Sequence, residues 1–462
     1  MRGLMTLSKK PSIKTTAVNV LLLACSFILF TSCLDSINTG PFLSGGSGTE
    51  SDPYRISTIE QLQAIDQEKY LDKHFIQVNN IDASETENYQ RGSGFKFIGD
   101  PERPFTGTYN GNGYKIKDLR LHIQRSGRDH TGIFGYVKGG VIKNVIIENT
   151  PRSPAKNQEL QHAYKSADFR EGNLAAKESD LLNRRGIGGL VGFNDGGVVS
   201  NCRFVGNVAG NISHSVGGLV GINTGLIEDS YFEGRVYGGA SSGLVVINKG
   251  DIVNSHAKGW LEGMSAYGLV INNKGLITQS FTDADVNGTF RATGLVGFNN
   301  GSIKKSYSLG TTQSDHISAG LVTDNNGEII NSFSLTEINA RYKDWSEDLF
   351  LSGGLVGQNL ENGLIIHSFF GGVLSVIEGD IGNDNIGGIS GINHSSITAS
   401  YWDTETTGQS QGVGEGNPDG AIGLTMQQMT GPAAETHMPE FDWVNVWRTT
   451  DGYPVLRWQE GE

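Results

Sequence analysis

Apolar and polar positions recur with a fixed spacing through residues 189–400. Each unit begins with Gly-Leu-Val-Gly or a near copy, and an Asn follows the Leu by four residues. The Leu or Ile positions are Leu190, Leu219, Leu244, Leu269, Leu295, Leu321, Leu355 and Ile389. The Asn positions are Asn194, Asn223, Asn248, Asn273, Asn299, Asn325, Asn359 and Asn393. Such regular spacing indicates one structural unit that is copied and stacked.

The length of the unit predicts its fold. Successive Leu positions are 29, 25, 25, 26, 26, 34 and 34 residues apart. A unit of this length is too short for a pair of helices, and its apolar positions lack a 3.6-residue period. Leu and β-branched residues separated by glycines are typical of short strands with tight turns. We therefore predict an all-β parallel β-helix (β-solenoid) of roughly ten coils, which would be about 50 Å long at ~4.8 Å per coil.

The Asn row is predicted to be structural. Asn tolerates the left-handed backbone conformation that a tight corner requires. Stacked amides can also donate to one neighbour and accept from the other, as in cross-β stacks. The alternative is a row of ligand-binding side chains, but the constant offset from an apolar position in every unit favours a structural ladder.

A row of aromatic residues follows the Ser of most units, and its role is open at this point. Its members are Tyr231, His256, Phe281, Tyr307, Phe333, Phe369 and Tyr401. An exposed row would suit stacking on sugar rings, whereas a buried row would be ring-on-ring packing. Phe at three of the seven positions favours burial.

Both ends of the repeat array are predicted to be capped. Ser57 and Glu60 form a capping-box pair before an apolar stripe, which predicts a short helix over the first coil. The repeat body is placed at residues 47–410. Two inserts, at 151–185 and 336–352, would loop out of the column. These loops would either carry recognition or have no role. Residues 411–462 are expected to form a C-terminal cap, with a helix started by the capping pair Thr425 and Gln428, and with Trp443, Trp447, Tyr453 and Trp458 as its aromatic residues.

Composition narrows the class of protein. Gly accounts for 65 of the 462 residues, but no three-residue period accompanies it, which excludes collagen. Lys and Arg total 36 against 49 Asp and Glu, which gives a formal charge of −13. An acidic surface repels phosphate backbones, so we expect no nucleic-acid partner.

Residues 1–33 resemble the signal peptide of a bacterial lipoprotein. Basic residues precede an apolar stretch, and Thr31-Ser32-Cys33 resembles the end of a lipobox, with Cys33 as the lipidation site. Cys25 is an alternative site, and a transmembrane anchor is a second alternative, although the stretch is shorter than the ~20 residues a spanning helix requires. Residues 34–46 would then be a flexible tether that joins a lipid-anchored protein to the outer membrane.

Complete catalytic and metal-binding motifs are missing from the sequence. None of the ten histidines begins a His-Glu-x-x-His zinc motif, and no nucleophile elbow or phosphate-binding loop is present. Asp380 and Asp384 could hold a cation, but the interpretation as a solvated loop is favoured. We therefore assign no catalytic residue, no metal site and no cofactor.

The sequence of residues 217–231 resembles the GLUG motif of bacterial surface adhesins, which also occurs in non-catalytic regions of IgA-specific metallopeptidases. The segments 46–65, 105–119, 400–408 and 452–456 are similar to other parts of such proteins, and residues 151–185 have no counterpart. The resemblance implies a surface location and adhesion. It does not identify a ligand.

Two functions remain open on this basis. The first is a non-enzymatic surface adhesin or binding module that engages a host protein, a matrix protein or a glycan through one flank of the solenoid. The second is a polysaccharide lyase or glycoside hydrolase built on the same column, which would need basic and acidic side chains to converge from neighbouring coils. Fold analogy alone does not decide between them.

Overall fold

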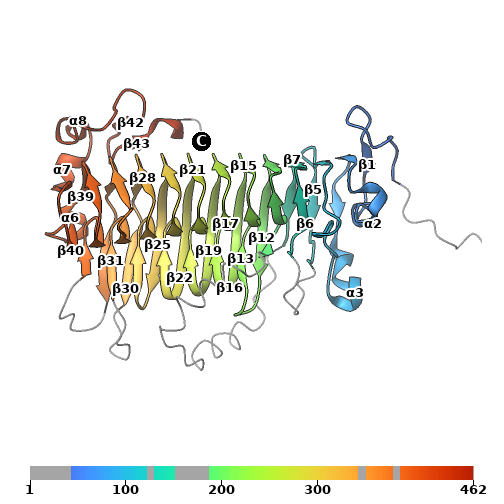
Figure 1. Ribbon diagram of the computed structural model, residues 1–462, viewed down its shortest axis with the longest axis horizontal. Helices are drawn as coiled ribbons and strands as arrows, with labels where there is room; N and C mark the ends of the chain where they lie inside the picture. The colour runs from blue at the N-terminus through green and yellow to red at the C-terminus, as the bar shows by residue number, and fades with distance from the viewer. Residues whose placement is uncertain (1–42, 122–129, 151–186, 342–349, 378–384, 461–462) are drawn as a thin grey trace, which may run out of the picture. The chain divides into compact units, whose positions relative to one another are not determined.

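The protein forms a column of stacked parallel strands (Figure 1). The computed structural model describes residues 43–121, 130–150, 187–341, 350–377 and 385–460, and every described helix and strand lies in the compact unit Ser44–Glu462. The strands of successive coils pair in parallel from the first described coil to the last. The predicted all-β parallel β-helix is therefore confirmed, while the insert expected at 151–185 and the predicted lipidation site Cys33 lie outside the described residues.

Three long sheets run the length of the column. The first has twelve strands in the order β1 (Tyr54–Ile56), β2 (His74–Gln77), β4 (Thr108–Asn110), β7 (Val141–Lys143), β11 (Val198–Ser200), β15 (Leu226–Glu228), β18 (Asp251–Val253), β21 (Leu276–Thr278), β24 (Ser302–Lys304), β28 (Glu328–Ile330), β33 (Leu364–Ile366) and β38 (Ser396–Thr398).

The second sheet has ten strands and contains the Gly-Leu-Val-Gly segments. Its order is β40 (Val413–Gly416), β37 (Ser390–Asn393), β32 (Val356–Asn359), β27 (Val322–Asn325), β23 (Val296–Asn299), β20 (Val270–Asn273), β17 (Val245–Asn248), β14 (Val220–Asn223), β10 (Val191–Asp195) and β6 (Phe134–Lys138).

The third sheet has nineteen strands, because many coils contribute two short strands to it. In chain order these are β3 (Ile81–Asp82), β5 (Lys115–Lys117), β8 (Ile146–Glu148), β9 (Ile187–Gly188), β12 (Arg203–Ala209), β13 (Ser215–Gly217), β16 (Tyr231–Ser242), β19 (His256–Tyr267), β22 (Phe281–Thr293), β25 (Tyr307–Ser314), β26 (Ile317–Ala319), β29 (Phe333–Ser334), β30 (Glu337–Arg341), β31 (Leu351–Gly353), β34 (Phe369–Phe370), β35 (Leu374–Ile377), β36 (Asn385–Gly387), β39 (Ser400–Asp403) and β41 (Ala421–Leu424). Strands β16, β19 and β22 are continuous and 12 or 13 residues long.

The repeat positions line the inside of the column. All eight Leu and Ile positions of the Gly-Leu-Val-Gly segments are completely buried. The β-branched position of the twelve-stranded sheet, for example Ile227 and Ile252, is also completely buried. Because the spacing is constant, each apolar side chain stacks on its copy in the next coil, and the core is continuous along the column.

The asparagines of the repeat form a hydrogen-bonded ladder inside the column. Each side-chain Nδ2 donates to the Oδ1 of the Asn in the next coil, at 2.8–2.9 Å, from Asn194 to Asn393. All eight side chains are buried, with 0–1% of the residue exposed. The ladder therefore satisfies polar groups that would otherwise cost free energy in the core.

The predicted backbone conformation of these asparagines is wrong. They lie at or one residue before the ends of strands in the ten-stranded sheet, and none of them has a positive φ. The left-handed corner lies instead at the residue before the Ser, for example Asp229 (φ 48°) and Asn254 (φ 45°). Lys305 and His367 also occupy this position in their coils, so the corner does not depend on Asn.

The serines form a second ladder. The backbone N–H of each Ser donates to the Oγ of the Ser in the next coil at 3.1–3.3 Å, from Ser230 to Ser400. Each Oγ in turn donates to the carbonyl two residues earlier at 2.7–3.0 Å. The repeated Ser is therefore structural, which explains why it recurs beside the aromatic row.

The glycine that follows the ladder Asn is required by the close approach of neighbouring coils. A Cβ on Gly225 would lie 2.0 Å from the carbonyl oxygen of Gly197, and a Cβ on Gly250 would lie 2.0 Å from that of Gly225. A side chain at Gly225 or Gly250 would push two coils apart, which explains the Gly in these coils, whereas the last repeat has Ser395 at this position.

The first coil is covered by helix α2 (Ile59–Ala64), which confirms the predicted helix but corrects its cap. Thr58, not Ser57, is the N-cap residue, and its side chain accepts from the backbone N–H of Gln61. Gln61 accepts from the backbone N–H of Ser57 at 2.8 Å. Short helical turns η1 (Glu68–Tyr70), η2 (Ser84–Asn88) and α3 (Tyr89–Gly92) lie in the connections that follow.

The column extends further than the sequence indicated. Strand β40 pairs with β37 and β41 pairs with β39, so part of the segment 411–462 continues the sheets. Likewise β30, inside the segment 336–352 that was expected to loop out, pairs with β25 and β35. Helix α6 (Thr404–Thr407) precedes these last strands.

The remaining C-terminal residues, 426–460, are here called the C-terminal strap. They comprise helices α7 (Met426–Met429) and α8 (Ala433–His437), the antiparallel pair β42 (Trp447–Arg448) and β43 (Val455–Leu456), and the turn η4 (Arg457–Gln459). Helix α7 has the predicted capping box, in which Thr425 and Gln428 bond reciprocally.

Candidate ligand-binding face

The aromatic row lies on the outer side of the column. In strands β16, β19 and β22 the residues next to the row, Phe232, Ala257 and Thr282, are completely buried in the core. Side chains alternate along a strand, so the row itself points outward. From Tyr231 to Phe369 the rings stack face to face, with centroids 4.5–5.1 Å apart and interplanar angles of 3–14°.

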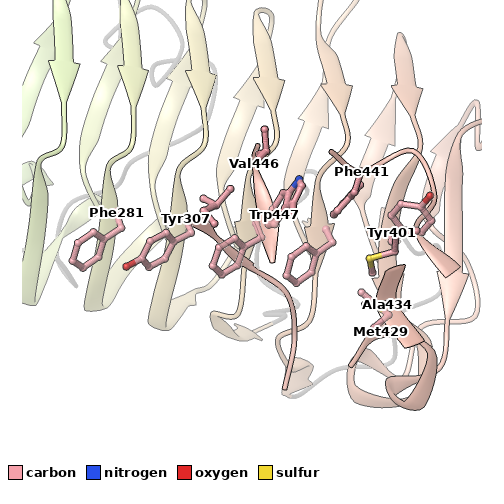
Figure 2. Packing of buried hydrophobic residues seen from close by; sticks show 12 residues of the cluster. Phe281, Tyr307, Tyr401, Met429, Ala434, Phe441, Val446 and Trp447 are labelled. Atoms are coloured by element: carbon pink, nitrogen blue, oxygen red, sulfur yellow. The ribbon is translucent and has the colours of Figure 1, made fainter. Parts of the chain in front are cut away.

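The C-terminal strap covers most of this row (Figure 2). Phe441 packs against Tyr401 at 5.3 Å, Trp447 against Phe369 at 5.6 Å, and Trp458 against Tyr307 at 5.7 Å between ring centroids. Consequently the five rings Phe281, Tyr307, Phe333, Phe369 and Tyr401 are 0–4% exposed. The strap therefore runs back along the side of the column, which the prediction of a terminal cap missed.

Polar groups fix the strap to the column at several coils. The indole Nε1 of Trp458 donates to the carbonyl of Lys305 at 2.8 Å. The hydroxyl of Tyr453 donates to Asp403 at 2.6 Å, and that of Tyr401 donates to Glu440 at 2.7 Å. The bond from Tyr453 to Asp403 therefore joins the strap to strand β39.

Only the first two rings of the row, Tyr231 and His256, remain partly exposed. Their faces are occupied, because each ring is stacked on its neighbours and Arg203 lies over Tyr231 at 5.8 Å from the ring centroid. Burial, with a smaller effect of nearby Lys258, lowers the pKa of His256 to about 4, so its imidazole is neutral at neutral pH.

Trp260 lies on the same outer side, in the middle of β19, and 37% of it is exposed. The guanidinium of Arg235, on β16, lies over the indole at 5.6 Å from the ring centroid. The indole Nε1 donates to Glu262 at 3.3 Å. These two contacts hold the indole in one orientation at the surface.

Charged side chains surround Trp260 in register. Arg235, Trp260 and Asp285 are directly paired across β16, β19 and β22, and Glu233, Lys258 and Asp283 are paired two residues earlier. We call the outward side chains Glu233, Arg235, Lys258, Trp260, Glu262, Asp283 and Asp285 the outer face of the long strands. Opposite charges alternate across it, which keeps a flat sheet surface soluble.

Sequence reasoning did not single out this face. The repeat drew attention to positions that recur in every unit, whereas Trp260 occurs in one coil. The available signal was its place in the strand: Trp260 precedes the buried Leu261 in a strand whose Ala257 is also buried. The alternation of side chains therefore predicts that Trp260 points outward.

Other groups in the described part of the chain give no site. The buried thiol of Cys202 has its pKa raised to about 12 by burial, which makes it unreactive. Among the described residues no three His, Cys, Asp or Glu side chains are grouped so that they could hold a metal ion. No helix in the described ranges is long and apolar enough to cross a membrane.

Comparison with known families supports the repeat assignment. The family described as the GLUG motif matches this chain at residues 183–209 and 212–237, which include β12, β14 and β15. The chain is a GLUG-repeat protein. The remaining repeats of this GLUG-repeat protein have the same Leu and Asn spacing and the same register in the structure.

Two relatives of this GLUG-repeat protein share part of its sequence. Halomucin of Haloquadratum walsbyi is 30% identical over 121 residues, which is 25% of this chain and 1% of Halomucin. A protein of Evansella cellulosilytica, described as a Gly-rich membrane protein, is 34% identical over 107 residues, which is 22% of this chain and 12% of that protein. The GLUG-repeat protein thus spans a small part of both relatives. No solved structure matches it.

Proposed function

We propose that this protein is a surface-associated, non-enzymatic adhesin or binding module, and that its ligand contacts the outer face of the long strands. The observation that carries the proposal is the exposed indole of Trp260, which Arg235 and Glu262 hold in place on a flat surface. An aromatic side chain with fixed orientation provides contact area at low entropic cost, which is typical of binding hot spots.

The rest of the column supports this role as a scaffold. The ladders of buried Asn and Ser side chains and the stacked apolar core hold β16, β19 and β22 in register. Binding groups placed on regular strands keep their relative positions better than groups on loops. The ligand partners that we consider are a host protein, a matrix protein or a glycan.

A surface location is part of the proposal. One relative is described as a membrane protein, and the first 33 residues resemble a lipoprotein signal peptide. We propose that Cys33 is acylated, that residues 34–46 form a tether, and that the protein is held at the outer membrane of a bacterium with the column facing outward. The lipid anchor makes the membrane its second partner.

The test is an array of glycans and matrix proteins probed with the wild-type protein and with Trp260→Ala. We expect the wild-type protein to bind at least one ligand and the variant to lose about tenfold or more in affinity, since tenfold corresponds to about 1.4 kcal/mol. Tyr114→Ala is the matched control, because Tyr114 is also 37% exposed but lies outside this face. Binding that Trp260→Ala leaves unchanged contradicts the proposal.

The same preparation should be tested for the alternative function. A lyase would release unsaturated uronide products from acidic polysaccharides, which are detected by their absorbance. Product formation by the pure protein that is lost in a single variant of the outer face, such as Lys258→Ala, would replace the adhesin by an enzyme.

A further inference from the structure

The two sides of the Trp260 indole differ, and the difference points to a class of ligand. On the side of β16 the guanidinium of Arg235 lies over the ring. On the side of β22 the directly paired neighbour is Asp285, whose side chain is much shorter than that of Arg or Trp. The indole surface next to Asp285 is therefore the side of Trp260 open to a ligand.

Asp285 retains capacity for hydrogen bonds to a ligand. One carboxylate oxygen accepts from the hydroxyl of Thr311 at 2.7 Å, which orients the group. An ionised carboxylate can accept about four hydrogen bonds through its two oxygens, so acceptor positions remain. Glu262 similarly uses one oxygen for the indole Nε1. The open side of the indole is thus bordered by the oriented carboxylate of Asp285, and Glu262 lies two residues further along β19.

We infer that this position is a saccharide subsite that takes one neutral pyranose unit of a glycan; the inference rests on the proposed binding function. The C–H groups of the sugar ring carry partial positive charge and would pack against the negative face of the indole. Ring hydroxyls would donate to Asp285 and Glu262. No bond is made or broken in this step.

Charge favours a neutral sugar over an acidic one. The outer face carries three cations with Arg203 included and four carboxylates, and the whole chain has a formal charge of −13. More specifically, the acceptor at the open side of the indole is a carboxylate, while Arg235 lies on the other side. A uronic acid stacked there would place its own carboxylate against Asp285, which costs binding free energy.

The open end of the aromatic row does not compete for this role. His256 is stacked on Tyr231 and Phe281 at 4.7 and 4.5 Å, and the other face of Tyr231 is covered by the guanidinium of Arg203, 5.8 Å from the ring centroid. A stacked sugar requires a free ring face. Trp260 offers one, so a single subsite at Trp260 and Asp285 is what the geometry supports.

The experiment measures dissociation constants by titration calorimetry for cellotetraose and chitotetraose, which are neutral, and for tetragalacturonate, which is acidic. We expect at least one neutral tetrasaccharide to bind more tightly than tetragalacturonate. Trp260→Ala and Asp285→Asn should each weaken that binding by about tenfold, because they remove the stacking surface and the charged acceptor respectively. Asp285→Asn keeps the size of the side chain and an acceptor for Thr311.

Asp251→Asn is the control, because Asp251 is an exposed carboxylate on β18 of the twelve-stranded sheet and lies outside the outer face of the long strands. Unchanged binding in Asp285→Asn, or tighter binding of tetragalacturonate, overturns the inference. If the array shows Trp260-dependent binding of a protein ligand and no saccharide binds, the inference fails while the proposed function stands. If nothing bound in the array depends on Trp260, the proposed function fails as well.

Discussion

At the scale of single residues, the repeat is explained by side chains that meet their own copies. Asn273 is completely buried, donates to Asn299 and accepts from Asn248, both at 2.9 Å. An Asn carries a donor and an acceptor on one short amide, so one residue type can serve every coil. Asp would lack the donor, and an apolar residue would lack both groups.

We expect Asn273→Leu to destabilise the column by about 1–3 kcal/mol, because it leaves buried polar groups of two neighbouring coils without their partner. The measurement is the midpoint of urea unfolding. Lys274→Leu is the control, since it introduces the same side chain at the adjacent exposed position. Equal midpoints for the two variants would show that the ladder contributes nothing to stability.

The spacing of Asn and Leu was sufficient to predict which residues stack, because a fixed offset in sequence becomes a fixed position in every coil. It was insufficient to predict backbone conformation. Asn or Asp fills most of the left-handed corners, as at Asp229, but Lys305 and Ala399 fill others, so residue type alone did not locate the corner.

At the scale of elements, the strap packs on the outside of the column and does not form one of its coils. It contacts outer rings rather than the core, and its Trp447 is completely buried between Phe333, Phe369 and Phe441. The coils contact mainly their neighbours, as in other solenoids, so their stability should depend little on the strap.

We therefore expect Trp447→Ala to release the strap and leave the column folded. Removal of a buried Trp side chain costs about 3–5 kcal/mol. This loss exceeds the contribution of the few polar contacts that would still hold the strap on the column. Limited proteolysis should then cleave within residues 426–460, and a dye that binds apolar surface should detect the uncovered rings. Val444→Ala is the control, because Val444 lies in the strap and is 78% exposed.

Hydrogen exchange distinguishes the two outcomes for this variant. Amides of strands β16 to β29 should keep their protection if the strap is an independent unit. An equal loss of protection in the strap and in these strands would show that they unfold together, and the strap would then be part of the core.

The strap illustrates what the sequence could not supply at this scale. Its aromatic residues and the capping pair Thr425 and Gln428 indicated an ordered segment, and that segment is present. Its direction depends on contacts such as the bond from Trp458 to Lys305, which are 153 residues apart in the chain. Local patterns carry no information about such a pairing, and the same limit hid the open side of Trp260, which depends on three neighbouring strands.

At the scale of the whole molecule, the face proposed for binding is one part of a surface on which outer rings are covered and charges alternate. The strap covers five outer rings, and charges alternate on the long strands, so large apolar patches are avoided. A protein organised in this way is useful only where ligands can reach that face. The location of the chain is therefore part of the proposed function.

The last prediction concerns that location and tests Cys33 against Cys25. Wild-type protein expressed in a bacterium should incorporate a radioactive fatty acid and partition into detergent, because each buried CH₂ of an acyl chain contributes about 0.8 kcal/mol to membrane binding. Cys33→Ser should abolish the label, and Cys25→Ser should keep it. The reverse result would move the lipidation site to Cys25. If neither the wild-type protein nor either variant incorporates the label, a transmembrane anchor is favoured over acylation.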